Sequence, residues 1–320
     1  MSIGKDEGLA TLEVVFSEEE LGAYTEFRKI GLTEKSVDWI ERASATFWDA
    51  TNGTINKEIL DALRTFVLGK YNCECAKSKQ LGFAKAFLKY LTKTRLDPRF
   101  SAFDLFLERP KTLKARKHVT PRIVTQADIE NVIAYILKRA AEGRINEERA
   151  KNYVAFVLFG AYTGQRSLST MAKLSVGQCR EGIRAYPPCV LVNSSQDKIR
   201  MEHYVPLHPC LISYLSRLFD GKTDAEPLFE YNSFQMWVKR AKIPMSRFKG
   251  HFVLGDLRKF AEQYGDVIGW DQSNRAYILT HGVSGVDWSH YKHPLPEHVY
   301  DVYMRYWKNV RFTFEDVFDC

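Results

Sequence analysis

The sequence predicts an α+β protein that is mainly α-helical with one small β-sheet, and three observations lead to this fold class. Apolar residues recur at helical spacing along most of the chain. Two short runs of β-forming residues, CVLV and HYVPL, lie close together at 189–192 and 203–207. A basic stretch with two prolines at 109–122 interrupts the helical pattern, so the 320 residues are expected to form two domains.

The composition is that of an ordinary globular protein, with 45% hydrophobic and 27% charged residues. No stretch reaches the roughly 18 uninterrupted apolar residues of a membrane span, and the N-terminus lacks the basic-then-apolar pattern of a secretion signal. We therefore expect a cytoplasmic protein. Its net charge of +7 fits a nucleic-acid partner but does not establish one.

The six cysteines are scattered, and only Cys73 and Cys75 lie close together. A C-x-C pair needs a second pair or nearby histidines to complete a zinc site, and the sequence offers neither. We expect reduced thiols that mostly pack as small apolar groups, with no metal and no cofactor.

The first domain is predicted as all-helical over 17–108, after a segment at 1–16 that lacks a clear period and is expected to be a flexible arm. Three apolar stripes at helical spacing support this. They comprise Val37, Ile40, Ala43 and Phe47; then Ile55, Ile59, Leu63, Phe66 and Val67, entered through Thr54 as a helix cap; then Leu81, Ala84, Leu88 and Leu91.

Basic residues lie beside the third apolar stripe, and others lie in the linker predicted at 109–122. The stripe is accompanied by Lys77, Lys79, Lys85 and Lys89, and the linker carries Lys114, Arg116 and Lys117 among its six basic residues. Charges of this kind either track a DNA backbone or form a solvated face and hinge, and composition leaves both alternatives open.

The catalytic domain is predicted over 123–320. Thr125 and Asp128 form a capping-box-like helix start. The buried face of that helix is expected to be Ile129, Val132, Ile133, Ile136 and Leu137. An apolar helix then ends near Arg166, the two β-rich runs suggest a hairpin with Lys198 at or just past its turn, and helical spacing returns twice. The last two helices contain Leu254, Leu257, Ala261, Tyr264 and Ile268, and Val299, Val302, Tyr303, Tyr306 and Trp307.

Five polar side chains on separate elements could perform phosphoryl transfer together. Arg166 and Arg258 could grip a phosphodiester through charge-assisted hydrogen bonds. Lys198 on the hairpin could protonate a leaving oxygen, and the Tyr291 phenol becomes a better nucleophile where cations lower its pKa. With His281 added, this set needs no metal ion.

Three of these five residues also have a plain alternative. Arg258 could pair with Asp256 or Glu262, and His281 could be a hydrogen-bonded core histidine. Tyr291 competes as nucleophile with tyrosines whose helical spacing favours packing, namely Tyr300, Tyr303 and Tyr306.

The order and spacing of the five residues resemble the tyrosine recombinases, the phage-type integrases and their relatives. The matching motifs are TGQR (163–166), the hairpin lysine, DLRKFA (256–261), LTHG (279–282) and a tyrosine ten residues after the histidine. SHYKH (289–293) is most similar to integrases of archaeal viruses and plasmids. The resemblance extends over about residues 17–310, and its first part is similar to the DNA-contacting core-binding domain of the family.

The resemblance implies a role for each of the five residues. Arg166 and Arg258 would clamp the scissile phosphate, Lys198 would protonate the departing 5′ oxygen, and His281 would hydrogen-bond a phosphate oxygen. Tyr291 would attack and become linked to the DNA 3′ phosphate, without ATP or metal. It further implies double-stranded DNA attachment sites as partners, carriage by a mobile genetic element, and nucleoid association. The C-terminal helix would dock on a neighbouring protomer, giving a homotetramer on DNA from a free monomer or dimer. The aromatic stripe of this helix could instead pack on its own domain, and the sequence leaves both alternatives open.

Two positions depart from the family pattern. Gly255 stands where the family usually has His or Lys, so another group, with His251 and Lys249 as nearby candidates, must accept the tyrosine's proton, or activity is weakened. The acidic residue that commonly follows the first arginine by one turn is absent, with Ser169 and Thr170 in that region, which leaves the support of Arg166 open.

Three other functions fit parts of the sequence. A type IB topoisomerase shares the chemistry, although the small helical first domain and the compact spacing argue against it. A DNA-binding protein of this fold could have lost catalysis, with Gly255 as the sign, and a helical protein without a nucleic-acid role is the third. For the preferred function we expect Arg166→Ala to abolish cleavage with little loss of folded structure.

Overall fold

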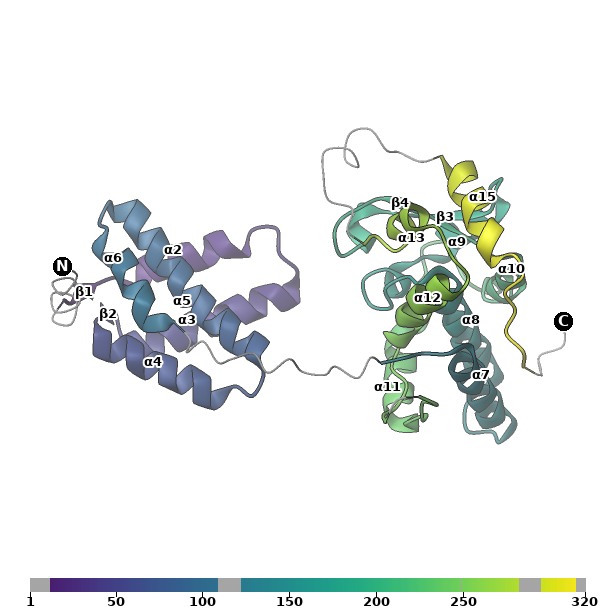
Figure 1. Ribbon diagram of the computed structural model, residues 1–320, viewed down its shortest axis with the longest axis horizontal. Helices are drawn as coiled ribbons and strands as arrows, with labels where there is room; N and C mark the ends of the chain where they lie inside the picture. Colours follow the sequence, from purple (N-terminus) through teal and green to yellow (C-terminus); the bar gives the residue numbers. More distant parts are fainter. Residues whose placement is uncertain (1–11, 109–121, 248, 282–294, 315–320) are drawn as a thin grey trace. The chain divides into compact units, whose positions relative to one another are not determined.

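The computed structural model describes residues 12–108, 122–247, 249–281 and 295–314 (Figure 1). The chain divides into two units, Met1–His118 and Val119–Cys320, and each has its own hydrophobic core. Helices predominate, and the strands form two small antiparallel sheets, so the predicted fold class is confirmed. Within the described ranges, no helix has the length and apolar character needed to cross a bilayer.

The first unit packs its helices around aromatic side chains. Its elements are β1 (Val14–Val15), α2 (Glu18–Lys29), α3 (Glu34–Thr51), β2 (Thr54–Ile55), α4 (Lys57–Lys70), α5 (Glu74–Arg95), α6 (Arg99–Ala102) and the 3-10 turn η1 (Phe103–Leu107). Phe87 of α5 is fully buried, and its ring lies 5.1 Å from that of Phe16 and 5.5 Å from that of Phe47. These long-range ring contacts tie α3 and α5 to Phe16, the residue that follows β1.

Three expectations for this unit were wrong. Residues 12–16 are not an arm, because Val14 pairs with Ile55 and Phe16 is buried. The helix predicted from the second apolar stripe is α4, and it begins after Asn56 and not at Thr54. The Asn56 side chain caps α4 by accepting from the Ile59 N–H. Phe66, placed on the buried stripe, is half exposed.

The second unit is built around one buried helix. Its elements are α7 (Gln126–Ala141), α8 (Glu147–Thr163), η2 (Met171–Lys173), α9 (Val176–Arg184), β3 (Cys189–Val192), η3 (Ser194–Gln196), β4 (His203–Pro206), α10 (Pro209–Ser216), α11 (Tyr231–Ala241), α12 (Asp256–Val267), α13 (Gln272–Ile278) and α15 (Pro296–Trp307). The α7 capping box at Thr125 and Asp128 and the predicted buried face are confirmed. β3 and β4 form the predicted antiparallel hairpin, with Val190 opposite Val205.

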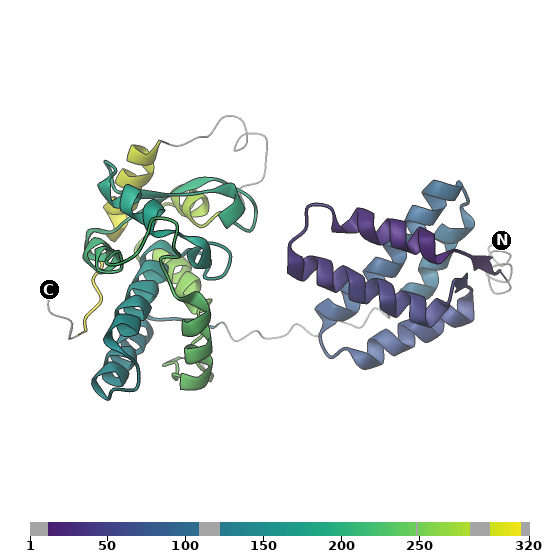
Figure 2. The same ribbon diagram turned by 180° about the vertical axis from the view of Figure 1, so that it is seen from behind.

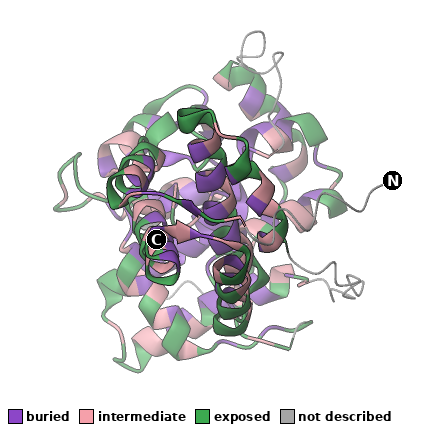
Figure 3. Cartoon of the chain, turned by 90° about the vertical axis from the view of Figure 1, so that its left-hand side faces the viewer, coloured by how far each residue is buried: buried purple, intermediate pink, exposed green. Residues whose placement is uncertain are grey.

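Helix α8 is covered by α7, α10 and α12, which Figure 1 labels and Figure 2 shows from behind, so it is buried almost all round. Figure 3 colours the buried residues of the chain purple. Gly160 permits the close approach of α12, because a Cβ atom there would lie 2.6 Å from Leu257 Cδ1. Burial on every side explains why the run at 153–162 is apolar without a period. The end of α8 is thereby fixed beside the start of α12.

The aromatic stripe of α15 lies in the core of its own unit. Trp307 is fully buried, with ring centroids 5.4 Å from Trp270 and 5.6 Å from Tyr303. The Tyr303 hydroxyl donates to the Tyr162 carbonyl at 3.0 Å. The expectation that this stripe docks on a neighbouring protomer was therefore wrong: large aromatic rings at helical spacing serve intramolecular packing here.

Candidate functional site

The TGQR motif forms the turn that ends α8. Gly164 has φ +64°, and its N–H donates to the Gly160 carbonyl at 2.9 Å. A Cβ atom at Gly164 would lie 2.9 Å from Ala261 Cβ and would overlap Leu279 Cδ2, so only glycine fits. The buried Gln165 side chain then donates to the Ile278 carbonyl at 2.7 Å. These contacts hold the turn rigidly against α12 and the end of α13.

Arg166 follows this turn and is held by three hydrogen bonds. Its Nη1 donates to Asp197 Oδ1 at 2.7 Å and to Thr280 Oγ1 at 2.5 Å, and its Nη2 lies 3.4 Å from the Thr280 carbonyl. The side chain is 19% exposed, whereas that of Asp197 is fully buried. A guanidinium has five N–H donors, so Arg166 keeps donors for an anion on its accessible side.

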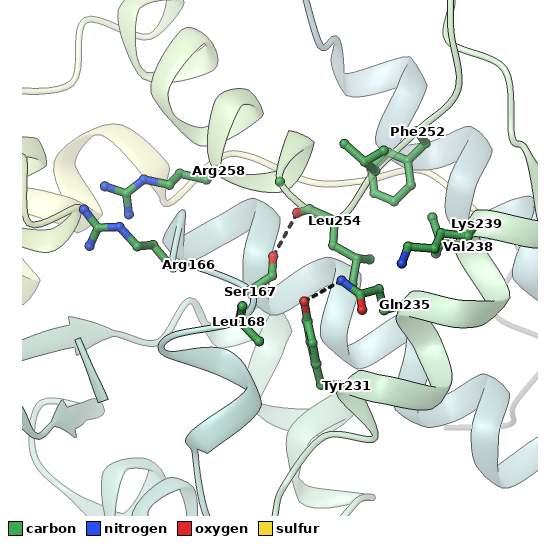
Figure 4. A pocket seen from close by; sticks show the side chains of 12 residues that line it. Arg166, Ser167, Leu168, Tyr231, Gln235, Val238, Lys239, Phe252, Leu254 and Arg258 are labelled. Atoms are coloured by element: carbon green, nitrogen blue, oxygen red, sulfur yellow. Dashed lines mark hydrogen bonds between the residues drawn. The ribbon is translucent and has the colours of Figure 1, made fainter. Parts of the chain in front are cut away.

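Arg258, in the first turn of α12, contacts the same segment before His281 as Arg166 does. Its Nη1 donates to the Gly164 carbonyl at 3.1 Å and its Nη2 to the Leu279 carbonyl. Figure 4 shows the two arginine side chains extended in the same direction. Burial, followed by the neighbouring Arg166 charge, lowers the pKa of Arg258 from 12.5 to about 10. Two cations so placed favour binding of an anion.

His281 follows the segment that both arginines hold. Its Nδ1 lies 3.1 Å from Glu262 Oε1, and its backbone N–H donates to the Ala276 carbonyl at 2.9 Å. Burial, then the Arg258 charge, lowers the pKa of His281 below its ordinary 6.5. Thr280 before it has φ +50°, which is strained for a β-branched residue. The contacts of Thr280 with Arg166 and Asp197 hold it in that conformation.

The structure brings four of the five predicted catalytic residues to this region. Lys198 is exposed in the connection between β3 and β4, directly after Asp197. Tyr291 lies outside the described residues.

Both structural alternatives proposed for Arg258 were wrong. Asp256 pairs instead with Arg122, at 2.5 Å between Oδ1 and Nε, and Glu262 pairs with His281. Arg122, which the sequence placed in the linker, is thereby anchored to the start of α12. His281 is half-buried at the edge of the site and is not a core histidine.

Gly255 borders an open hollow beside the two arginines. The hollow has a volume of about 330 Å³, and its lining includes Arg166, Arg258, Leu168 and Phe252 (Figure 4). A Cβ atom on Gly255 would meet nothing within 4 Å, so the position has room for a larger side chain, and Gly255 itself offers no group that could accept a proton. His251 and Lys249, the candidate replacements, line a different hollow together with Arg247.

The predicted DNA-contacting lysines of α5 have local partners. Lys77 pairs with Glu74 at 3.0 Å, and the Lys79 ammonium lies 5.5 Å from the centre of the Trp39 ring. Lys85 and Lys89 lie near Asp104, whose pKa burial raises and whose charge they stabilise. Lys114, Arg116 and Lys117 lie outside the described residues. DNA contact by these side chains stays a prediction.

Two residues of the site were missed from the sequence, Asp197 and Thr280. Asp197 stands directly before the predicted lysine, which is a signal that sequence reasoning could have used. Thr280 belongs to the quoted LTHG motif, but its left-handed backbone cannot be read from residue types. Over the described part of the chain, no three His, Cys, Asp or Glu side chains are grouped to hold a metal ion, and the five described cysteines are free.

No protein-family model matches the sequence, and no curated protein matches it. Solved structures do match. They include a lambda integrase dimer bound to a COC′ core site, with 14% identity and a TM-score of 0.55, over 86% of this chain and 98% of that one. The Tn1549 transposon integrase in complex with circular intermediate DNA matches with 10% identity and a TM-score of 0.54, over 87% and 96%. The protein therefore has the α-rich fold of the tyrosine recombinases.

Proposed function

We propose that this chain is a site-specific recombinase that cuts and rejoins DNA strands through a 3′-phosphotyrosyl intermediate. The observation that carries the proposal is the pair of half-buried guanidiniums of Arg166 and Arg258. They donate hydrogen bonds to two consecutive residues of the segment that precedes His281. Rigid cations with free donors suit a phosphodiester, whose two non-bridging oxygens accept charge-assisted hydrogen bonds.

In the proposed reaction the Tyr291 oxygen forms a bond to phosphorus, and the bond from phosphorus to the 5′ oxygen breaks. Lys198 gives its proton to that leaving oxygen. His281 accepts the phenol proton, because Glu262 on Nδ1 leaves Nε2 as acceptor and the lowered pKa keeps the ring neutral. The resulting imidazolium hydrogen-bonds a phosphate oxygen. A second strand's 5′ hydroxyl reverses these steps, with no ATP and no metal.

The proposed partner is double-stranded DNA carrying attachment sites, bound by both units, with the basic residues of α5 and of 109–122 contacting phosphates. We further propose assembly as a tetramer on DNA, through surfaces other than the α15 stripe, and carriage by a mobile element such as an archaeal virus or plasmid.

The proposal is tested with a pool of nicked duplexes of randomised sequence, incubated with the full chain in EDTA and without ATP. We expect a protein–DNA adduct on denaturing gels, lost in Tyr291→Phe and kept in the control Tyr300→Phe. Absence of the adduct contradicts the proposal. Two recovered duplexes that exchange strands identify a recombinase, whereas relaxation of supercoils alone identifies a topoisomerase.

Gly255 favours a second candidate, a DNA-binding protein of this fold with lost catalysis. That function predicts retarded mobility in native gels without any adduct. It also predicts that Gly255→His, whose side chain has open space to occupy, creates adduct formation that the unchanged chain lacks.

A further inference from the structure

Asp197 connects three segments of the site through one buried carboxylate. Its Oδ1 accepts from Arg166 Nη1 at 2.7 Å and from the Thr280 hydroxyl at 3.1 Å. Its Oδ2 accepts the backbone N–H of Ile199 at 2.9 Å and, at 3.4 Å, that of Met201. The turn around Lys198, the first arginine and the segment before His281 therefore share this single group.

The chemistry of these contacts makes Asp197 hard to replace. A buried carboxylate is costly unless charged and polar donors surround it, and here four donors do. Among the described residues, it is the one carboxylate in an ion pair with either guanidinium of the pair. The region one turn after Arg166 offers no acid: the Thr170 hydroxyl there is buried without a hydrogen-bond partner in the described structure.

We propose that Asp197 is the positioning residue of this site: it fixes the Arg166 guanidinium and, through the same carboxylate, the turn that presents Lys198. This role rests on the proposed function. Asp197, on the connection between β3 and β4, supplies the support for Arg166 that Ser169 and Thr170 do not provide. The same carboxylate sets the position of the Arg166 guanidinium relative to the turn that carries Lys198.

The test measures single-turnover cleavage, per folded molecule, by the full chain carrying Asp197→Asn. Asparagine keeps the size and an acceptor oxygen but loses the charge. We expect a rate loss on the order of 100-fold, as for a small misplacement of catalytic groups, with DNA affinity unchanged. The matched control is Asp128→Asn, a buried aspartate in the α7 capping box, which should lower stability but not this rate.

A second substrate distinguishes the effect of Asp197 on Arg166 from its effect on the turn that presents Lys198. Nicked duplexes with sulfur as the bridging 5′ atom release a thiolate, which needs no proton, so Lys198→Ala should recover the rate of the unchanged chain on them. Asp197→Asn should recover only partly, because Arg166 stays misplaced. An unchanged Asp197→Asn rate on the oxygen substrate, or full recovery on sulfur, overturns the proposal. An unchanged chain that forms no adduct overturns the proposed function itself.

Discussion

Arg166 and Arg258 hold neighbouring residues of one segment: Arg166 donates to Thr280, and Arg258 donates to the Leu279 carbonyl. Arg166 follows α8 and Arg258 lies in the first turn of α12, so this segment is fixed from two elements. Like charges brought together in a half-buried site bind an anion more readily than either charge alone. The function proposed for this chain depends on that relationship.

Arg166→Ala should abolish cleavage and also lower the free energy of unfolding by about 3 kcal/mol, because it leaves the buried Asp197 carboxylate without its cation. The sequence alone suggested little loss of folded structure, and the ion pair changes that expectation. Urea unfolding measures the loss. The control Arg42→Ala removes an exposed pair with Asp38 and should hardly change stability; an equally stable Arg166→Ala contradicts the burial argument.

The pH dependence of cleavage should report the neutral form of His281. Because burial and Arg258 lower its pKa, more than half of the maximal single-turnover rate should be reached already at pH 6.5. Glu262→Gln removes a carboxylate that raises this pKa, so the midpoint should move to lower pH. A midpoint above 6.5, or an upward shift in the variant, is inconsistent with His281 as proton acceptor.

Gly164→Ala should destabilise the chain by about 3 kcal/mol, since it adds left-handed strain and a collision with Leu279 and Ala261. Gly143 has nearly the same conformation, with φ +68°, but open space around it. Gly143→Ala should therefore cost only about 1 kcal/mol. Thermal or urea unfolding of the two variants compares them, and equal losses would show that close packing at the TGQR turn contributes nothing.

Trp307→Ala should lower the free energy of unfolding by about 4 kcal/mol, because it removes a fully buried ring from the core. Packing within one chain predicts that this loss is independent of protein concentration. Unfolding curves recorded over a wide concentration range check this. A loss that grows on dilution would instead place the α15 stripe between protomers.

Local sequence patterns predicted the features that depend on local chemistry. The capping box at Thr125 and Asp128 fixed the start of α7, and the β-forming runs on either side of Lys198 gave the hairpin. Arg166, Arg258 and His281 were found because their motifs have a recognisable order along the chain.

Features that depend on distant partners were missed. Phe16 looked like part of an arm because its ring partners, Phe47 and Phe87, lie far away in sequence. Asp197 supports an arginine 31 positions earlier, and no spacing rule links the two. The α15 stripe fitted both intramolecular and intermolecular packing, since periodicity identifies an apolar face and not the surface that covers it.

Peptide mapping of the covalent adduct tests the central claim most directly. The protein is digested after reaction with the nicked duplex pool, and mass spectrometry locates the residue that carries a 3′-linked nucleotide. The proposed mechanism requires the nucleotide on the peptide that contains Tyr291, and on no peptide when Arg166 or Arg258 is replaced by alanine. A nucleotide on another residue, or adducts that persist without the arginine pair, would contradict it.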